Sequence, residues 1–250
     1  MSITIEPLLG IGRVEPGDDL ARLLAPPLAA IANPIRGDDV LVVCQKIVSK
    51  AEGRIVDLAS VTPSARAVEF AGSYGKDAAL VELALREATE VLRMENGHLI
   101  TATGPGFICA NSGIDRSNQN RDGDATLLPL DADDSARRLR AQLAEVSGME
   151  VAIVISDTFG RPWRLGQLDV AIGSAGLEVL DDHVGRSDWG GRRLEHTLIA
   201  VADQLAAAAG LVMGKADGVP AVLVRGYPYR RAAAAGAAAL VRPRSEDIFR

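Results

Sequence analysis

The chain has 250 residues, of which 48% are hydrophobic and 24% charged, and its formal net charge is −6. This composition is typical of a soluble globular protein that forms one large domain or two small ones. The acidic balance argues against general affinity for nucleic acid, and the three scattered histidines argue against a zinc site.

Two cysteines, Cys44 and Cys109, lie in apolar segments, so we expect small core residues rather than a disulfide framework. The sequence does not open with a basic segment followed by an apolar run, as a signal peptide would. The alanine-rich stretches are too short or too broken to span a bilayer. We therefore expect a cytoplasmic protein without a membrane partner.

Hydrophobic periodicity and turn residues predict a chain of mixed strands and helices, without an internal repeat or a linker that divides it. Asp18 or Asp19 is expected to cap the first helix, and Pro63 to lie in the first turn of the second. In chain order, the sequence predicts a strand at 3–9, a helix at 18–30, a strand at 40–49, helices at 62–72 and 77–93, strands at 98–103 and 106–110, a polar loop at 111–124, a helix at 131–146, strands at 151–155 and 175–180, a helix at 195–209, a strand at 220–224 and a helix at 230–240.

The most informative stretch is 151–164, VAIVISDTFGRPWR. Its first five residues are apolar and predict a strand buried on both faces, and a turn is expected to follow from Ser156. A carboxylate and a hydroxyl at the end of such a strand, Asp157 and Thr158, can hold a hard metal ion. They can equally well cap the turn through hydrogen bonds to the backbone.

A second strand-end carboxylate, Asp115, lies in the polar loop after the strand at 106–110. If Asp115 and Asp157 converge in space, they can share one or two divalent ions, as phosphoryl-transfer sites require. The alternative for Asp115 is an Asx-turn in a surface loop.

Lysines elsewhere in the chain are candidates for a phosphate site, although common nucleotide motifs are absent. The segment from Gly210 to Ala216 is too short for a phosphate loop, and Gly10-Ile11-Gly12 lacks the third glycine of a dinucleotide fingerprint. On the strand expected at 40–49, Lys46 and Lys50 would share a face about 13 Å apart, where they could straddle a triphosphate or simply meet solvent.

Arg161 and Arg164 flank Trp163 in the predicted turn. A guanidinium pairs well with phosphate or carboxylate, so both arginines are candidates for substrate contacts. The alternative is that they coat the rim of the turn.

Together these segments resemble the coenzyme F-420-0:L-glutamate ligase family, the γ-glutamyl ligases that build the tail of a deazaflavin coenzyme. The resemblance covers almost the whole chain, and its motifs occur in the expected order. The matching segments are PLLGIGRVEPGDDL near the start, CQKIVSKAEGR at 44–54, NSGIDRSN at 111–118, VISDTFGRPWRLGQLDVAIG at 154–173, LVMGKADGVPAVLVRG at 211–226 and the tail RPRSEDIFR, which fits the stand-alone form.

The resemblance implies an α+β fold with mixed and antiparallel sheets and packed helices. It also implies a protomer of two interwoven subdomains that assembles as an intertwined homodimer. The implied reaction activates a carboxylate of coenzyme F-420-0, or of a related precursor, by phosphorylation and joins it to L-glutamate. GTP is the implied phosphoryl donor, Mg²⁺ or Mn²⁺ and K⁺ are the implied ions, and GDP and phosphate are released.

The resemblance also assigns roles to individual residues. Asp115 and Asp157 fall on the family's metal-binding aspartates and Thr158 on a ligand of a second metal, while Arg161 joins the two aspartates as a catalytic candidate. Lys215 carries no metal role, because a protonated lysine cannot ligate, and Gln45 stands where some relatives have serine. The implied GTP contacts are Ile11, Gly12, Arg13, Val14, Gln45, Lys50, Asn118, Met213, Gly214, Lys215, Ala216, Asp217, Gly218, Val219 and Pro220.

Two other functions remain open at this point. A metal-dependent nucleotide phosphohydrolase or kinase could use the same aspartates without needing glutamate. A non-catalytic nucleotide-binding module could use them to bind metal without turnover.

Overall fold

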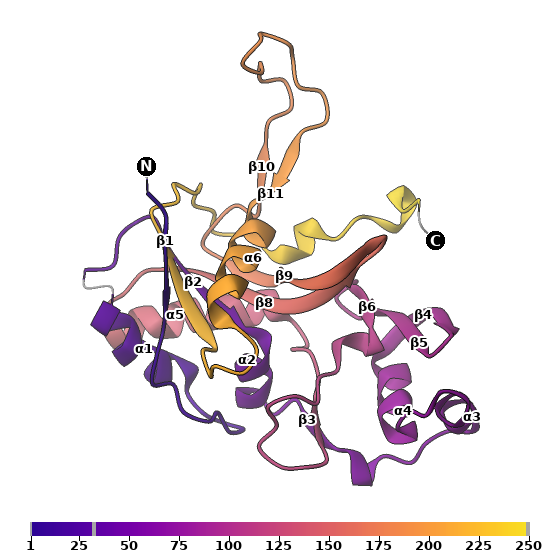
Figure 1. Ribbon diagram of the computed structural model, residues 1–250. Helices are drawn as coiled ribbons and strands as arrows, with labels where there is room; N and C mark the ends of the chain where they lie inside the picture. The colour runs from indigo at the N-terminus through magenta and orange to yellow at the C-terminus, as the bar shows by residue number, and fades with distance from the viewer. Residues whose placement is uncertain (1, 32–33, 249–250) are drawn as a thin grey trace.

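A five-stranded mixed sheet forms the centre of the molecule in the computed structural model, which describes residues 2–31 and 34–248 (Figure 1). The last two residues of the RPRSEDIFR segment lie outside the described residues. The strands are β1 Thr4–Pro7, β2 Asp39–Cys44, β3 Ile55–Asp57, β4 Ala88–Glu95, β5 His98–Thr103, β6 Ile108–Ala110, β7 Asp124–Thr126, β8 Ala152–Arg161, β9 Arg164–Ala175, β10 Leu180–Asp182, β11 Leu198–Ala200 and β12 Ala221–Arg225. The α-helices are α1 Leu20–Ile31, α2 Gln45–Ala51, α3 Ala65–Tyr74, α4 Ala78–Glu87, α5 Ala132–Ser147 and α6 Val201–Met213, and short 3-10 turns are η1 Leu58–Ser60, η2 Asn111–Gly113, η3 Ala237–Leu240 and η4 Arg244–Glu246.

The central sheet has the order β1-β12-β2-β8-β9 and is covered on both faces. Only β2 and β8 pair in parallel, and the other neighbours are antiparallel. Leu41 and Val43 of β2 face a core shared with α1 and α5, whereas Val40 and Val42 face a core shared with α6. Because side chains alternate along a strand, covering both faces requires the unbroken apolar runs seen in the sequence. The predicted mixed α and β fold is confirmed.

A smaller region packs beside the central sheet. It contains the antiparallel sheet β4-β5-β6, helices α3 and α4 and the pair β3-β7, with apolar clusters of its own. A ribbon made of β10 and β11 projects from the opposite end of the molecule (Figure 1). Along residues 2–31 and 34–248, no helix is both long and apolar enough to cross a membrane.

The strand predicted at 40–49 is wrong in its second half. β2 ends at Cys44, and α2 begins at Gln45, whose buried amide donates to Ser49 Oγ (2.6 Å) and to the Leu127 carbonyl (3.0 Å). Lys46 and Lys50 therefore lie one helical turn apart, at a Cβ separation of about 6 Å rather than 13 Å. The two lysines still share a face, for a different reason than the one predicted.

The turn predicted after Ile155 is also wrong. β8 continues to Arg161 because β9 pairs with it antiparallel along this whole length, and the chain reverses at Pro162 and Trp163. Trp163 adopts a positive φ of 58°, which such a tight reversal requires. Since β2 ends where Cys44 pairs with Ser156, Asp157 is the first residue beyond the parallel ladder. Asp157 therefore lies where the β2-β8 pairing stops, although it is still within strand β8.

Four further predictions need correction. The helix at 77–93 ends at Glu87, and β4 begins at Ala88. The strand predicted at 175–180 is a connection between strands, since β9 ends at Ala175 and β10 begins at Leu180. The helix at 195–209 starts only at Val201 and runs to Met213. The alanine-rich segment 230–240 forms only the turn η3, because the Asp133 carboxylate accepts from the backbone N–H groups of Ala237 (2.6 Å) and Ala238 (3.0 Å).

The other predicted elements are confirmed with shifted ends. Pro63 does not lie in the first turn of its helix as predicted, because α3 begins at Ala65 and Ser64 is its N-cap. Asp19 caps the first helix by accepting from the Arg22 N–H (3.1 Å), and Asp131 caps α5. Cys109 is buried and Cys44 partly buried, both as free thiols. Burial raises the pKa of both cysteines, that of Cys109 to about 12, so neither is a ready thiolate nucleophile.

Candidate active site

An acidic cluster of Asp115, Asp157 and Asp169 lies near the part of the β8-β9 hairpin that extends beyond the end of β2. Thr158 and Asp169 are cross-strand partners, and the Thr158 hydroxyl donates to Asp169 Oδ1 (2.5 Å). Asp157, the preceding residue, points to the other face of β8. Burial, with smaller contributions from the nearby charges of Asp115 and Asp169, raises the pKa of Asp157 to about 7, although a backbone hydrogen bond at Thr158 and the charge of Lys215 act in the opposite direction. The structure therefore brings Asp115 and Asp157 within electrostatic reach of each other, as the sequence suggested.

Asp115 forms the Asx-turn that was one of its two predicted roles, and it also pairs with a lysine. It forms an Asx-turn by accepting from the Ser117 N–H (2.6 Å), and its backbone pairs with Thr126. Its other carboxylate oxygen forms an ion pair with Lys46 (2.7 Å). Burial works against the ionised form, but the Lys46 and Ser117 hydrogen bonds leave the pKa of Asp115 below its usual value. Asp115 is thus a fixed carboxylate and not a freely moving loop residue.

Two lysines partly neutralise the cluster. Lys46 pairs with Asp115, and Lys215 donates to the Thr158 hydroxyl and lies 3.4 Å from Asp169 Oδ1. These contacts place cations beside the carboxylates, where they can also meet an anionic substrate.

The polar loop 115–120 links the other predicted site segments. Lys50, only 5% exposed, donates to the Asn118 carbonyl and to Asn120 Oδ1, both at 2.7 Å. The Asn120 amide donates in turn to the Val14 carbonyl (2.8 Å), and the Asn118 amide donates to the Lys215 carbonyl (3.3 Å). Burial lowers the pKa of Lys50, and the nearby Lys46 charge lowers it further. The turn at 11–14, Lys50 and the loop at 213–220 are therefore joined through one loop.

Other predicted residues lie outside this network. Gln45 is buried and satisfied by Ser49 and Leu127, and the Val14 side chain is in the core, so a ligand could reach that turn only through its backbone. Arg161 is four residues beyond Asp157 on an extended strand, about 13 Å along the chain. Its guanidinium donates to the Gly166 carbonyl (3.5 Å) at the hairpin tip.

Two residues of the network, Asp169 and Asn120, were missed by sequence reasoning. Asp169 becomes a site residue only through its register with Thr158, and Asn120 only through its bond to a turn more than a hundred residues away. The alternation of Gln167 and Asp169 with Leu168, typical of a strand, was the available signal for Asp169.

The cluster offers carboxylate and hydroxyl oxygens, the donors that Mg²⁺ and Mn²⁺ prefer. Within the described ranges, however, no three His, Cys, Asp or Glu side chains are close enough to form a metal-binding group. Two of the three clustered carboxylates, Asp115 and Asp169, form ion pairs with lysines. These ion pairs would have to break before the same oxygens could bind a metal. The metal roles of Asp115, Asp157 and Thr158 stay predictions.

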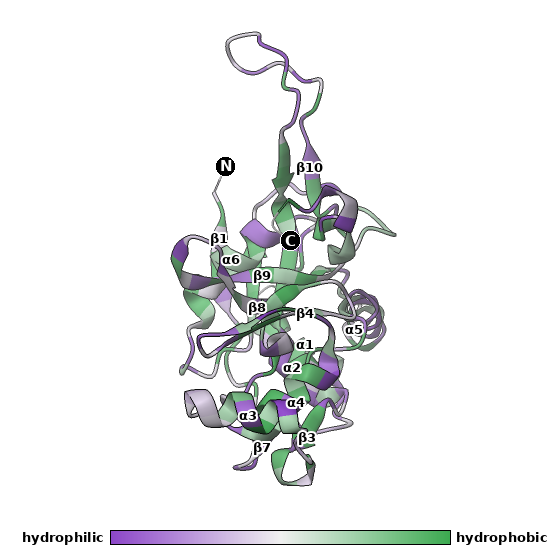
Figure 2. Cartoon of the chain, turned by 90° about the vertical axis from the view of Figure 1, so that its right-hand side faces the viewer, coloured by the Kyte–Doolittle hydropathy of each residue, from purple (hydrophilic) through white to green (hydrophobic). Residues whose placement is uncertain are grey.

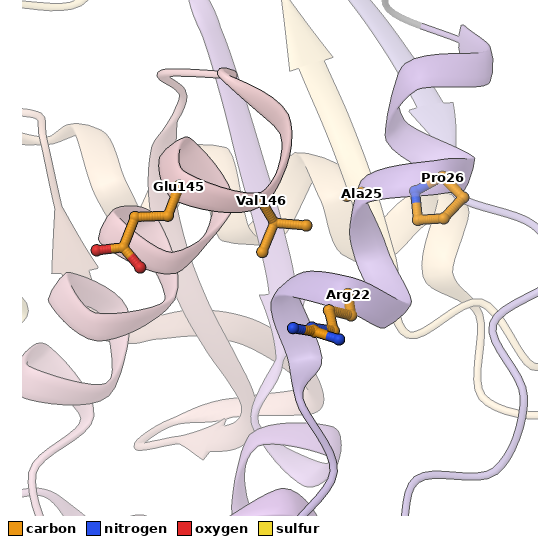
Figure 3. Close-up of a pocket in the computed structure, with 5 residues that line it drawn as sticks. All are labelled: Arg22, Ala25, Pro26, Glu145 and Val146. Atoms are coloured by element: carbon orange, nitrogen blue, oxygen red, sulfur yellow. The ribbon is translucent and has the colours of Figure 1, made fainter.

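Two cavities differ in their relation to this cluster. One of about 920 Å³ adjoins the β8-β9 hairpin and includes Phe159 and Val170 in its wall. Another, of about 620 Å³, is an open hollow between α1 and α5 (Figure 3). Figure 3 shows Arg22 and Glu145 at its sides, and its wall contains no residue of the acidic cluster.

Comparison with known proteins identifies similar sequences along the whole chain. A family model described as F420-0:Gamma-glutamyl ligase matches residues 9–226. A protein named Coenzyme F420:L-glutamate ligase from Methanothermobacter thermautotrophicus is 46% identical, with all of both chains covered. Proteins of the same name from Methanopyrus kandleri and Archaeoglobus fulgidus are 43% and 41% identical, covering all of this chain and 98% and 97% of theirs.

Proposed function

The chain belongs to the F420-0:Gamma-glutamyl ligase family, and we propose that it joins L-glutamate to coenzyme F-420-0, or a related precursor, with GTP as the phosphoryl donor. The observation that carries this proposal is the network around the loop 115–120. It joins the acidic cluster to the lysines and to both glycine-containing segments that the family resemblance assigns to the nucleotide.

The chemistry of the reaction explains why such a site is needed. A free carboxylate does not form an amide at neutral pH, because its oxygen is a poor leaving group. Transfer of the γ-phosphoryl group of GTP to the acceptor carboxylate gives an acyl phosphate and GDP. The amine of L-glutamate then attacks the acyl carbon, and phosphate leaves with the bonding electrons.

The chain's own residues can position the anions of this reaction. Phosphoryl transfer depends chiefly on alignment and on charges that stabilise the oxygens of the transferred group. Lys46 and Lys215 are placed beside the acidic cluster, and Lys50 holds the loop that joins the nucleotide segments. Asp115, Asp157 and Thr158 would hold Mg²⁺ or Mn²⁺, which neutralises phosphate charge when bound. The K⁺ implied by the resemblance has no assigned residue.

Release of GDP from GTP, measured with and without precursor and L-glutamate, tests the proposal. We expect GDP release to require the precursor. The amide product is expected to form only when L-glutamate is also present. Steady GDP release without either substrate would indicate a phosphohydrolase, transfer to the precursor without use of glutamate would indicate a kinase, and nucleotide binding without turnover would indicate a binding module.

Replacing Lys50 by alanine is expected to raise the KM for GTP about tenfold or more, with little change in kcat. Lys50 organises ground-state contacts, which stabilise substrate and transition state alike, and tenfold corresponds to about 1.4 kcal/mol. The matched control is Lys76→Ala, an exposed lysine on another part of the surface. A steep fall in kcat at unchanged KM would instead make Lys50 a group that acts on the transferred phosphoryl.

We also propose that the chain forms an obligate homodimer. Both tryptophans of the chain lie at hairpin tips, Trp163 at 82% and Trp189 at 103% exposure, and Leu165 is 100% exposed. Tryptophan is usually mostly buried, so its exposure at two projecting tips favours a partner surface. Figure 2 shows that the distal loop of the β10-β11 ribbon is largely hydrophilic. Trp189 would therefore be the main apolar contact of this loop with a partner.

Light scattering at sub-micromolar concentration is expected to give twice the 26.3 kDa chain mass. The interface of such a dimer is expected to bury well above about 2,000 Å². Trp189→Asp is expected to shift the species toward monomer, and unfolding of the wild type should depend on protein concentration. Val68→Asp, on an exposed site of α3 far from the ribbon, is the control. A stable and active wild-type monomer would overturn the proposal.

A further inference from the structure

The cavity beside the β8-β9 hairpin has a composition unlike that of the acidic cluster next to it. Its volume of about 920 Å³ lies within the range of small-molecule sites. Its walls come from the sheet β4-β5-β6, the β8-β9 hairpin and the C-terminal segment after η3. The aromatic rings of Phe107 and Phe159 meet edge to face at 6.2 Å on one side, and Val91, Val170 and Val241 add aliphatic surface.

The cavity adjoins the acidic cluster along the β8-β9 hairpin. Phe159 lies two residues beyond Asp157 on β8, and Val170 is the cross-strand partner of Asp157. Since alternate residues of a strand share a face, Asp157, Phe159 and Val170 point to the same side of the hairpin, with Asp157 and Phe159 about 7 Å apart along the strand. A molecule lying against Phe159 can therefore extend a chain to Asp157.

The charges of the wall exclude two of the three substrates of the proposed reaction. The charged side chains are Glu90, Asp203 and Asp247 against Arg93 and Arg242, and Glu90 is paired with Arg244, so the wall has no surplus of positive charge and contains no lysine. A triphosphate or a glutamate dianion would lose water there and meet as many carboxylates as guanidinium groups. A flat aromatic ring system loses little on desolvation and gains contact with the aromatic and aliphatic walls.

We propose that this cavity binds the flat aromatic part of the acceptor substrate and directs its anionic chain toward Asp157. The inference rests on the proposed function, because that function supplies an acceptor with a ring and a carboxylate-bearing chain. The C-terminal segment forms the outer wall: Asp133 holds its start, and Arg244 pairs with Glu90 (2.8 Å) near its end. Val241 lies between these two attachments in the cavity wall, where it would contact the aromatic ring of the acceptor.

Filling the cavity tests the proposal without removing any charged group. Val241→Trp places an indole in the outer wall, and Val91→Trp does the same from β4, so the test does not depend on the C-terminal segment alone. The control is Ile248→Trp in the same segment, at an exposed residue (83%) outside the cavity wall. Equilibrium dialysis measures acceptor binding in the absence of GTP, and initial rates give the KM of each substrate.

We expect both filling variants to weaken acceptor binding and raise its KM at least tenfold. KM for GTP and for L-glutamate should change less than twofold, and Ile248→Trp should match the wild type. Wild-type acceptor affinity in both filling variants would overturn the inference, and so would a change in molecular mass without a change in acceptor binding, which would assign the cavity to the contact with a second copy. A wild-type protein that does not ligate would instead refute the proposed function, even if it binds the acceptor.

Discussion

Replacing Asp157 by asparagine is expected to lower kcat/KM for ligation by about 10²–10³ while the protein stays folded. Such a loss corresponds to about 3–4 kcal/mol of transition-state stabilisation. Asp157 lies inside β8 and is partly buried, so asparagine keeps the shape of the side chain and removes only its charge. With Asp115 and Asp169 nearby, the site presents carboxylates where a phosphoryl group and its cation must be aligned.

The measurement is the initial rate of amide formation at saturating Mn²⁺, together with thermal unfolding of each variant. Asp122→Asn, which changes an exposed aspartate of the loop 111–124, serves as the matched control. Near-normal activity of Asp157→Asn would remove this residue from the reaction. A large loss of stability with proportionate loss of activity would make it a structural residue of the hairpin.

The sequence predicted the buried centre of the fold well, because there the hydrophobic pattern and the tertiary environment agree. The five apolar residues from Val151 to Ile155 are at most 2% exposed, and the amphipathic helix that precedes them is α5. The apolar run at 40–49 was ambiguous, since it suits a buried strand or a buried helix equally. Its change to helix at Gln45 depends on a hydrogen bond to Leu127, which no local pattern reveals.

Local propensity failed where distant groups hold the backbone. The segment 230–240 is rich in alanine, the best helix former, yet Asp133 binds its N–H groups in a turn. Intrinsic preference of under 1 kcal/mol per residue is readily exceeded by such contacts. The hairpin extension of β8 is a similar case, because the pairing with β9 keeps polar and glycine residues extended.

The candidate site was predictable as a set of residue types but not as a geometry. Asp115 and Asp157 were identified as carboxylates that could converge, and the charge of Asp115 does raise the pKa of Asp157. The bridging role of Asn120 depends on the Val14 carbonyl, and the position of Lys215 depends on Thr158. These contacts join segments far apart in sequence, so they exist only after the sheet and its loops have assembled.

A second large effect is expected far from the site, at the buried ion pair between Asp39 and Arg225. Asp39 is 0% exposed and accepts from Arg225 Nε (2.7 Å) and Nη2 (2.8 Å), and also from the Arg36 N–H (2.6 Å). The hydrogen bond to Asp39 raises the pKa of Arg225, so the guanidinium is firmly charged. The two residues are register partners at the first position of β2 and the last position of β12, so the pair joins neighbouring strands at one end of the central sheet.

Asp39→Ala is expected to lower the free energy of unfolding by about 3–5 kcal/mol, because it leaves the mostly buried charge of Arg225 without a carboxylate to balance it. This is a large share of the roughly 5–15 kcal/mol that stabilises a typical domain. Urea denaturation at fixed protein concentration measures the loss, and Asp38→Ala, at the adjacent and more exposed aspartate, is the control. If Asp39→Ala lost less than about 1 kcal/mol, water would have to reach the guanidinium. Asp39→Leu combined with Arg225→Leu should recover much of the loss, since the penalty comes from the unpaired charge and not from the missing attraction.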